Sequence, residues 1–121
     1  MKALIIDDEN DIRRIARLAL AKVGKMEVID ASTGLEGIEK ATLENPDVIL
    51  LDVMMPTMDG PTTLAALKEN PITKKIPVIF LTAKAMPAEL ERLKALGAKG
   101  VLTKPFDPLI LASQVKNLID G

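Results

Sequence analysis

The segment Pro46-Asp-Val-Ile-Leu-Leu-Asp-Val-Met-Met-Pro-Thr-Met-Asp-Gly60 joins a continuous apolar run to a single carboxylate. The apolar run at 48–51 is typical of a strand buried on both faces of a parallel sheet, and Asp52 follows it directly. Beyond Asp52, Pro and Gly predict a loop in which Asp59 or Gly60 caps the next helix. Taken alone, Asp52 fits a structural turn at a strand end as well as it fits a chemical role.

Composition narrows the possible chemistry. A length of 121 residues is typical of one domain, so we expect a single domain over 1–121. The chain has two aromatic residues, both Phe, and its core must therefore be mainly aliphatic. It has no Cys and no His, which excludes disulfides, thiol nucleophiles and imidazole bases. Any reaction must use carboxylates, hydroxyls or lysines.

Charge and hydropathy narrow the possible partners. The net charge is −1, with Lys and Arg interspersed among Asp and Glu, so we expect no direct binding to nucleic acid. The first apolar run, 3–6, is too short for the core of a signal peptide and leads directly into acidic residues. No run approaches transmembrane length, so we expect a cytoplasmic protein that does not bind a membrane.

Strands and helices alternate along the chain. The expected strands are 3–6, 26–29, 48–51, 76–81 and 100–103, of which the second is weak and suits an edge. The expected helices are 9–23, 33–44, 62–69, 87–96 and 108–119. Apolar residues expected to face the core include Ile12, Ile15, Ala16, Ala19, Leu20 and Val23 in the first helix, Leu35, Ile38 and Ala41 in the second, and Leu90, Leu93 and Leu96 in the fourth. These short βα units predict an α/β fold, doubly wound, with helices on both faces of a five-stranded parallel sheet.

Polar side chains follow four of the expected strands. Asp7 and Asp8 follow the first strand, Asp52 the third, Thr82 the fourth and Lys104 the fifth. The carboxyl ends of parallel strands meet at one edge of the sheet, where such folds bind ligands, so we expect these side chains to converge. Singly, each has a structural explanation, such as a helix cap for Asp8. Their joint occurrence favours a functional site.

The expected cluster suits phosphoryl chemistry. Three carboxylates repel one another unless a cation lies among them, and Mg²⁺ accepts a few carboxylates together with waters and a phosphate oxygen. Lys104 and Thr82 add a positive charge and a hydroxyl donor at the same point. We therefore expect a site for a phosphoryl group on a carboxylate.

Three blocks of sequence form a specific set: Ile-Ile-Asp-Asp-Glu at 5–9, Leu-Asp-Val-Met-Met-Pro-Thr-Met-Asp-Gly at 51–60 and Lys-Pro-Phe at 104–106. Through them the whole chain resembles the receiver domains of two-component response regulators. The resemblance implies the flavodoxin-like strand order 2-1-3-4-5. It also implies a signalling domain rather than an enzyme, although one that takes part in its own phosphorylation and dephosphorylation.

The resemblance implies roles for individual residues and partners. A sensor histidine kinase, or a phosphotransfer protein, would phosphorylate Asp52, after which Thr82 would hydrogen-bond the phosphoryl oxygens and Lys104 would pair with them. The Mg²⁺ ligands that it implies are Asp7, Asp8, Asp52 and the backbone carbonyl of Met54. The output would be a downstream protein or a fused effector domain, and the residues leave open whether the chain is a stand-alone regulator or part of a longer protein.

The chain departs from the usual receiver pattern at the switch. Receivers often carry an aromatic residue three places before the lysine, and here that place is Val101, so we do not expect an aromatic switch. A shift of the loop after the fourth strand, driven by Thr82, would still bias the face formed by the last two helices. Met54 and Lys84 lie beside the expected path of a hydrolytic water, and we predict that they slow the loss of the phosphoryl group by crowding it.

Two apolar residues are candidate contacts for partner proteins. Ile12 falls where receivers often dock a kinase helix, although its helical phase favours the core. Phe106, in a loop beside the expected site, is the better candidate for an exposed anchor. The alternative for Phe106 is that it closes the core under the last helix.

Three other functions remain open. A small Mg²⁺-dependent phosphohydrolase also uses a strand-end aspartate, but it needs a second acid nearby, and Val53 and Met54 are apolar. A flavodoxin-like nucleotide binder needs a phosphate-cradling first loop, whereas the acidic residues at 7–9 repel anions. The third is a receiver-like interaction module that is never phosphorylated, which the intact acid, threonine and lysine set disfavours.

Overall fold

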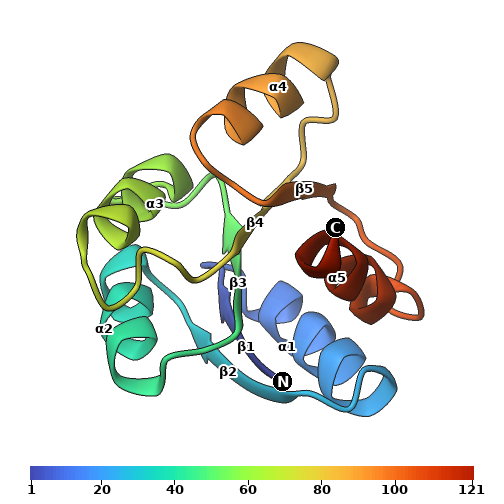
Figure 1. The fold of residues 1–121 in the computed structure, drawn as a ribbon. Helices are drawn as coiled ribbons and strands as arrows, with labels where there is room; N and C mark the ends of the chain where they lie inside the picture. Colours follow the sequence, from blue (N-terminus) through green and yellow to red (C-terminus); the bar gives the residue numbers. More distant parts are fainter.

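Five parallel strands form the centre of the protein, and the computed structural model describes all 121 residues. The strands are β1 (Lys2–Ile6), β2 (Glu27–Ala31), β3 (Val48–Asp52), β4 (Val78–Thr82) and β5 (Gly100–Thr103). The helices are α1 (Asn10–Leu18), continued by a π-helical turn (Ala19–Val23), α2 (Gly34–Glu44), α3 (Gly60–Glu69), α4 (Pro87–Ala95) and α5 (Leu111–Asp120). None of them combines the length and the apolar character that crossing a membrane requires. The sheet order is β2-β1-β3-β4-β5, which confirms the predicted fold (Figure 1).

Two apolar layers enclose the sheet. One layer lies between the sheet and helices α1 and α5, and the other lies between the sheet and helices α2, α3 and α4 (Figure 1). Strand β3 contributes to both layers because its side chains alternate: Val48 and Leu50 belong to the first layer, and Ile49 and Leu51 to the second. Every residue of β3 is buried, which confirms it as the central strand predicted from its apolar run.

The inward face of the first helix is narrower than its periodicity predicts. Ala16, Ala19 and Leu20 are buried as expected. Ile15 and Val23 are exposed, and their predicted core positions are wrong. The end of this helix is a π-helical turn, which holds more residues than an α-helical turn and so rotates Val23 away from the sheet. Ile15 lies outside the apolar layer that Ala16, Ala19 and Leu20 form with the sheet.

Leu35 and Leu96 are also exposed, contrary to prediction. The buried residues of α2 are all small, namely Gly34, Gly37 and Ala41, and Ile38 is half-buried beside them. A Cβ atom on Gly37 would collide with the side chain of Ile6, so α2 can lie this close to the sheet only because Gly37 has no side chain. Leu96 follows the last residue of α4, where the chain leaves the helical face.

The helix caps differ between the two loops that lead from the strands into the predicted site. Asp59 caps α3 as predicted, and its Oδ1 accepts a hydrogen bond from the amide of Thr62 at 2.9 Å. Asp8 does not cap α1, because the residue at the cap position is Glu9, whose side chain makes no capping hydrogen bond. The carboxylate of Asp8 is therefore free for another role.

The loop before α5 also differs from prediction. Strand β4 and helix α5 begin later than expected, at Val78 and Leu111, because a hydrogen-bonded turn precedes each of them. Phe106 is half-buried and packs against the apolar layer under α1 and α5. Its predicted role as an exposed anchor is therefore wrong, and it closes the core instead.

Candidate functional site

Sheet hydrogen bonds continue beyond the strand ends and hold the predicted site residues in place. These backbone bonds run from the amide of Asp7 to Ala31 (3.1 Å), from Val53 to Leu81 (3.1 Å) and from Lys104 to Thr82 (2.8 Å). The side chains at the carboxyl edge of the sheet therefore project from backbone that is ordered by the same ladder as the core.

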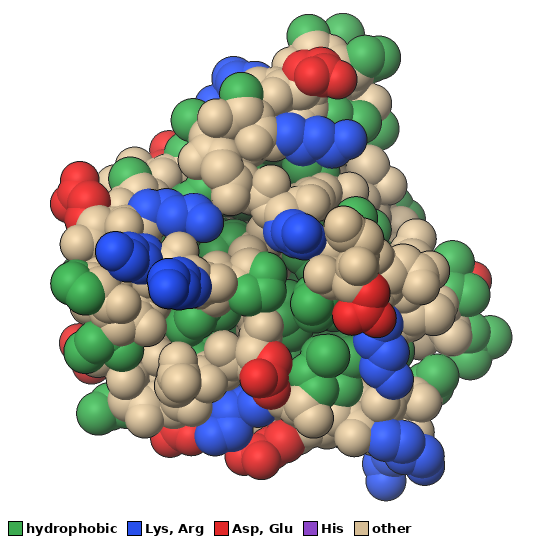
Figure 2. Space-filling model, in the orientation of Figure 1, with side chains coloured by type: hydrophobic (Ala, Val, Ile, Leu, Met, Phe, Trp, Pro, Cys, Tyr) green, Lys and Arg blue, Asp and Glu red, His purple; other side chains and the backbone are tan.

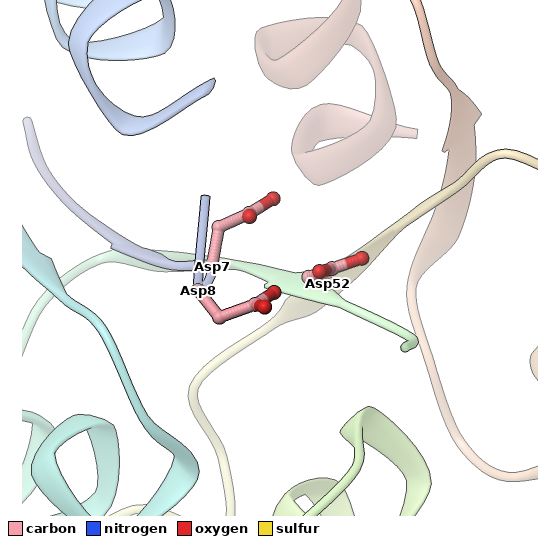
Figure 3. Close-up of side chains that lie close together, drawn as sticks. All are labelled: Asp7, Asp8 and Asp52. Carbon is pink, nitrogen blue, oxygen red and sulfur yellow. The ribbon is translucent and has the colours of Figure 1, made fainter. Parts of the chain in front are cut away.

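Asp7, Asp8 and Asp52 form an acidic cluster at this edge (Figure 3). One carboxylate oxygen from each of the three residues lies within 4.8 Å of the others. Asp7 is fully buried and the exposed fraction of Asp52 is 4%, whereas Asp8 is exposed. The cluster is thus built on two buried carboxylates and is open to solvent on the side of the third.

The cluster fits a hard divalent cation. Asp7 Oδ1 accepts a hydrogen bond from the amide of Glu9 at 2.8 Å. Asp7 Oδ2 is buried and lies 2.8 Å from the ammonium of Lys104. A cluster of three carboxylates with one side open to solvent suits Mg²⁺, which binds a few carboxylates and keeps several waters.

Lys104 supplies the cation of the site. Its Nζ lies 2.8 Å from Asp7 Oδ2, 3.2 Å from Asp52 Oδ1 and 3.5 Å from Glu9 Oε1. Burial lowers the pKa of Lys104, but hydrogen bonding and Coulomb attraction to Asp7 and Asp52 outweigh burial and hold that pKa above its ordinary value. Lys104 therefore remains charged and faces both buried carboxylates.

The carboxylate of Asp52 is only partly compensated. Burial is the largest cause that raises its pKa, the charge of Asp7 raises it further, and Lys104 opposes both, with a net pKa of about 6. At neutral pH Asp52 is therefore mostly ionised, desolvated and close to a second negative charge. One lysine does not neutralise three carboxylates, so this edge attracts a further cation.

Thr82 and Met54 occupy neighbouring positions but do not join the charged contacts. Thr82 is buried at the end of β4, and its Oγ1 accepts a hydrogen bond from the amide of Lys84 at 3.0 Å. Its hydroxyl makes no hydrogen bond with the side chain of Asp52 or of Lys104 in this structure. The side chain of Met54 is 68% exposed, and its carbonyl oxygen accepts no hydrogen bond.

A groove of about 600 Å³ lies beside the cluster, between the loop after β3 and helix α4. The residues that line it include Met54, Pro56, Thr82, Lys84 and Arg92. The groove brings solvent, or a small molecule, to the side of the site where Met54 and Lys84 are found. The groove is also lined by Val53, the residue that follows Asp52.

Two residues of the site were missed by reasoning from the sequence. Glu9 lies near Lys104 and supplies the amide that holds Asp7, and its signal was its place in the acidic run after the first strand. Gly60 allows α3 to begin against β3, because a Cβ atom there would collide with the carbonyl oxygen of Asp52 and the Cα of Val53. Only the three-dimensional contact distinguishes this role from that of an ordinary loop glycine.

Comparisons with known proteins agree along nearly the whole chain. The model of the response regulator receiver domain family matches residues 3–116. Protein PilG of Pseudomonas aeruginosa is 37% identical over 116 residues, which cover 96% of this chain and 85% of PilG. The solved structure of the chemotaxis response regulator CheY4 of Vibrio cholerae superimposes with a TM-score of 0.89 at 35% identity, covering 97% of each chain.

Other relatives are longer than this chain. The uncharacterized transcriptional regulatory protein YclJ of Bacillus subtilis is 37% identical over 119 residues, which cover 98% of this chain but 51% of YclJ. The match is therefore to a receiver unit that occurs alone or joined to other segments. Because the family model spans most of the chain and the solved relatives share its fold, the chain belongs to the family of response regulator receiver domains, which are the phosphoacceptor signalling domains of two-component systems.

Proposed function

We propose that Asp52 is the residue that accepts the phosphoryl group in this receiver domain, from a sensor histidine kinase or a phosphotransfer protein. The observation that carries the proposal is the position of the Asp52 carboxylate, which is buried, 3.2 Å from the Lys104 ammonium and within the acidic cluster. No other carboxylate of the cluster ends a central strand. Residues 1–121 act in this proposal as one receiver unit in the cytoplasm.

The transfer replaces one bond to phosphorus by another. A carboxylate oxygen of Asp52 forms a bond to phosphorus while the bond from phosphorus to the donor's histidine nitrogen breaks, and the leaving imidazole takes up a proton from water. Lys104, which already lies beside Asp52, pairs with the phosphoryl oxygens. Receiver domains are signalling domains rather than classical enzymes, and this one contributes its own side chains to gaining and losing the group.

We assign the Mg²⁺ ligands to Asp7, Asp8, Asp52 and the backbone carbonyl of Met54. Receiver domains generally bind Mg²⁺ at an acidic cluster of this kind. The convergence of the three carboxylates to within 4.8 Å of one another and the free carbonyl oxygen of Met54 support the assignment. Bound there, Mg²⁺ would neutralise the charge that spreads over the oxygens of the transferring group.

Thr82 is the residue proposed to report the phosphorylated state. Its hydroxyl accepts a bond from the amide of Lys84 but still has its own hydrogen to donate, so it can turn toward a phosphoryl oxygen. Such a turn displaces the loop after β4 and with it helix α4, which biases the face formed by α4, β5 and α5 toward the downstream partner or a fused effector domain. Val101 is half-buried in the layer under α4 and takes the place of an aromatic side chain.

The proposed docking surface for the kinase is an apolar groove of about 440 Å³ on α1 and the loop before α5. Ile15, Leu18, Pro108 and Leu109 line it. Ile12, considered above for docking or for the core, is half-buried on the same helix. A Leu18→Asp variant should therefore lose transfer from the kinase and keep labelling by a small phosphodonor, whereas loss of both would contradict this surface.

The test of the acceptor is the intact mass after incubation with Mg²⁺ and acetyl phosphate, whose loss of acetate drives the same transfer. The wild-type chain should gain one phosphoryl group, and the gain should disappear with EDTA and in an Asp52→Asn variant. An Asp47→Asn variant is the matched control and should be labelled like the wild type. If neither labelling nor a beryllofluoride complex is found, the chain is the unphosphorylated interaction module.

A further inference from the structure

A pocket of about 360 Å³ opens at the amino-terminal edge of the sheet, at the opposite ends of the strands from the acidic cluster. Its walls come from the end of α3, the segment before β4, the connection from α4 to β5 and the end of α5. The residues that line it include Lys68, Lys75, Pro77, Gly97 and Lys99. Its volume lies within the range of about 300–1,000 Å³ that is usual for small-molecule sites.

Every charged side chain that lines this pocket is a lysine. Lys68, Lys75 and Lys99 form no ion pair with any carboxylate of the chain. Figure 2 shows Lys and Arg side chains gathered on this face over α3 and the segment that leads to β4. Lys68 Nζ donates to the carbonyl of Lys74 at 3.5 Å, which leaves its charge uncompensated. Lysines that line a concave surface without carboxylate partners raise the local concentration of anions.

The backbone that carries these lysines is anchored to the core. The buried hydroxyl of Thr73 donates to the carbonyl of Leu67 at 2.7 Å, which ties the segment before β4 to α3. The amide of Lys99 donates to the carbonyl of Val78 at 2.8 Å. Gly97 has a φ of +108°, which favours glycine, and its open side faces the Lys68 side chain. The pocket is thus formed before any ligand binds.

We propose that this pocket binds an anion that carries two or more phosphate groups, as inorganic pyrophosphate or the phosphate chain of a nucleotide does. A lysine ammonium is a compact charge with three donors, so it can contact phosphate oxygens from several directions. Three such groups match the charge of a diphosphate or triphosphate and exceed that of a single carboxylate. The proposal concerns the edge remote from Asp52 and is independent of phosphorylation there.

The test is a titration of the full chain with inorganic pyrophosphate in metal-free, low-salt buffer, followed by backbone amide NMR. Saturable shifts are expected at Gly97, Ala98 and Lys99. The Lys75→Gln/Lys99→Gln double variant should bind about tenfold or more weakly, since two charge-assisted contacts are lost. The matched control, Lys22→Gln/Lys25→Gln, removes the same charge elsewhere and should bind like the wild type. The corresponding titration with ATP distinguishes the two sources, because tighter binding with added shifts near Pro77 would identify a nucleotide.

Three outcomes would overturn the proposal. Shifts that do not saturate, or that avoid the pocket, would show that no site exists. Equal weakening by the pocket variant and the control variant would show general attraction to net charge. Binding of a single-stranded oligonucleotide that pyrophosphate does not displace would show that the lysines serve a polymer surface instead.

Discussion

The charged side chains are buried at one edge of the sheet and exposed to solvent at the other. At the carboxyl edge, Asp7 and Asp52 are buried around the ammonium of Lys104. At the amino edge, Lys2 pairs with Glu27 at 3.6 Å and with Glu44 at 3.0 Å, and both acids are largely exposed. Strand β1 begins at Lys2 and ends next to Asp7, so ordered backbone reaches both edges and the difference lies in solvation.

That difference agrees with the position of the proposed phosphorylation site. Exposed ion pairs contribute little to the free energy of folding, because water solvates the separated charges nearly as well as it solvates the pair. Buried carboxylates with incomplete compensation destabilise the folded chain, and they persist only where a cation or a reaction requires them. The buried charges at the carboxyl edge therefore lower stability, as expected of the proposed phosphorylation site, whereas the exposed ion pairs of Lys2 at the amino edge do not.

The largest expected effect is that of removing the cation at the carboxyl edge. A Lys104→Met variant leaves Asp7 and Asp52 buried without their common partner and should lower the free energy of unfolding by about 3–5 kcal/mol. Urea denaturation at pH 7 in EDTA measures the loss, with Lys84→Met as the control for an exposed lysine. Added Mg²⁺ should recover part of the stability of the Lys104 variant. Equal stability of the two variants would show that the edge is not a strained cluster.

Removing one of the carboxylates should have a smaller effect of opposite sign. An Asp52→Asn variant keeps the shape of the side chain and removes the charge that burial and Asp7 disfavour, so in EDTA it should raise the free energy of unfolding by about 1–3 kcal/mol. The same variant cannot accept a phosphoryl group, and stability and function therefore change in opposite directions. A loss of stability in this variant would mean that Lys104 compensates the carboxylate fully.

The pH dependence of the free energy of unfolding should also show that the charge of Asp52 is only partly compensated. The pKa of Asp52 is about 6 in the folded chain, and about 3.9 is ordinary for an unfolded chain. The folded state therefore binds this proton more tightly, so the stability that Asp52 contributes is greatest below about pH 4 and is lost as the pH rises toward about 6. Denaturation from pH 4 to 8 in EDTA should show a decline that Asp52→Asn lacks. A matching decline in the variant would assign it to another group.

The sequence predicted the five strands, and the carboxyl ends of all but β2 to within one residue, because both depend on local pattern. Strand β2 ends at Ala31, two residues later than expected. An unbroken apolar run followed by a carboxylate marked β3 and Asp52, and the alternation of strands with helices placed Asp7 and Lys104 at the same edge. Close approaches that depend on a glycine or another small residue were not predictable from local pattern. Gly37 against Ile6 is such a contact, and it is the reason why Leu35 was wrongly assigned to the core.

The charged centre of the site was more predictable than its surroundings. The convergence of Asp7, Asp52 and Lys104 follows from topology, because parallel strands end at one edge. The partner of the Thr82 hydroxyl depends on the path of a loop, and the inward position of Phe106 depends on where α5 begins. Neither the path of the loop after β4 nor the start of α5 produces a periodic pattern of apolar residues in the sequence.

A smaller effect is expected from access to the carboxyl edge. A Met54→Asn variant replaces an exposed apolar side chain beside the groove with one that can hydrogen-bond water, and should lose the phosphoryl group about threefold to tenfold faster, equivalent to about 1 kcal/mol in the barrier. The decay of labelled protein after removal of acetyl phosphate measures the rate. Met86→Asn makes the same change at a side chain of similar exposure, 70% against 68%, and should not alter the rate. An unchanged rate for Met54→Asn would mean that this side chain does not crowd the hydrolytic water.

The smallest expected effect is at the amino edge. A Lys2→Met variant removes the cation that Glu27 and Glu44 share, yet both acids stay in contact with water, and the urea midpoint should not move beyond experimental error. The comparison with Lys104→Met is direct, because each change removes one lysine that lies near more than one acid. Any small effect should vanish in 1 M salt, since screening acts on exposed charges first. If Lys2→Met destabilises the chain as strongly as Lys104→Met, the loss of stability does not depend on whether the paired acids are buried. The burial of Asp7 and Asp52 would then give no support to the acidic cluster as the functional site.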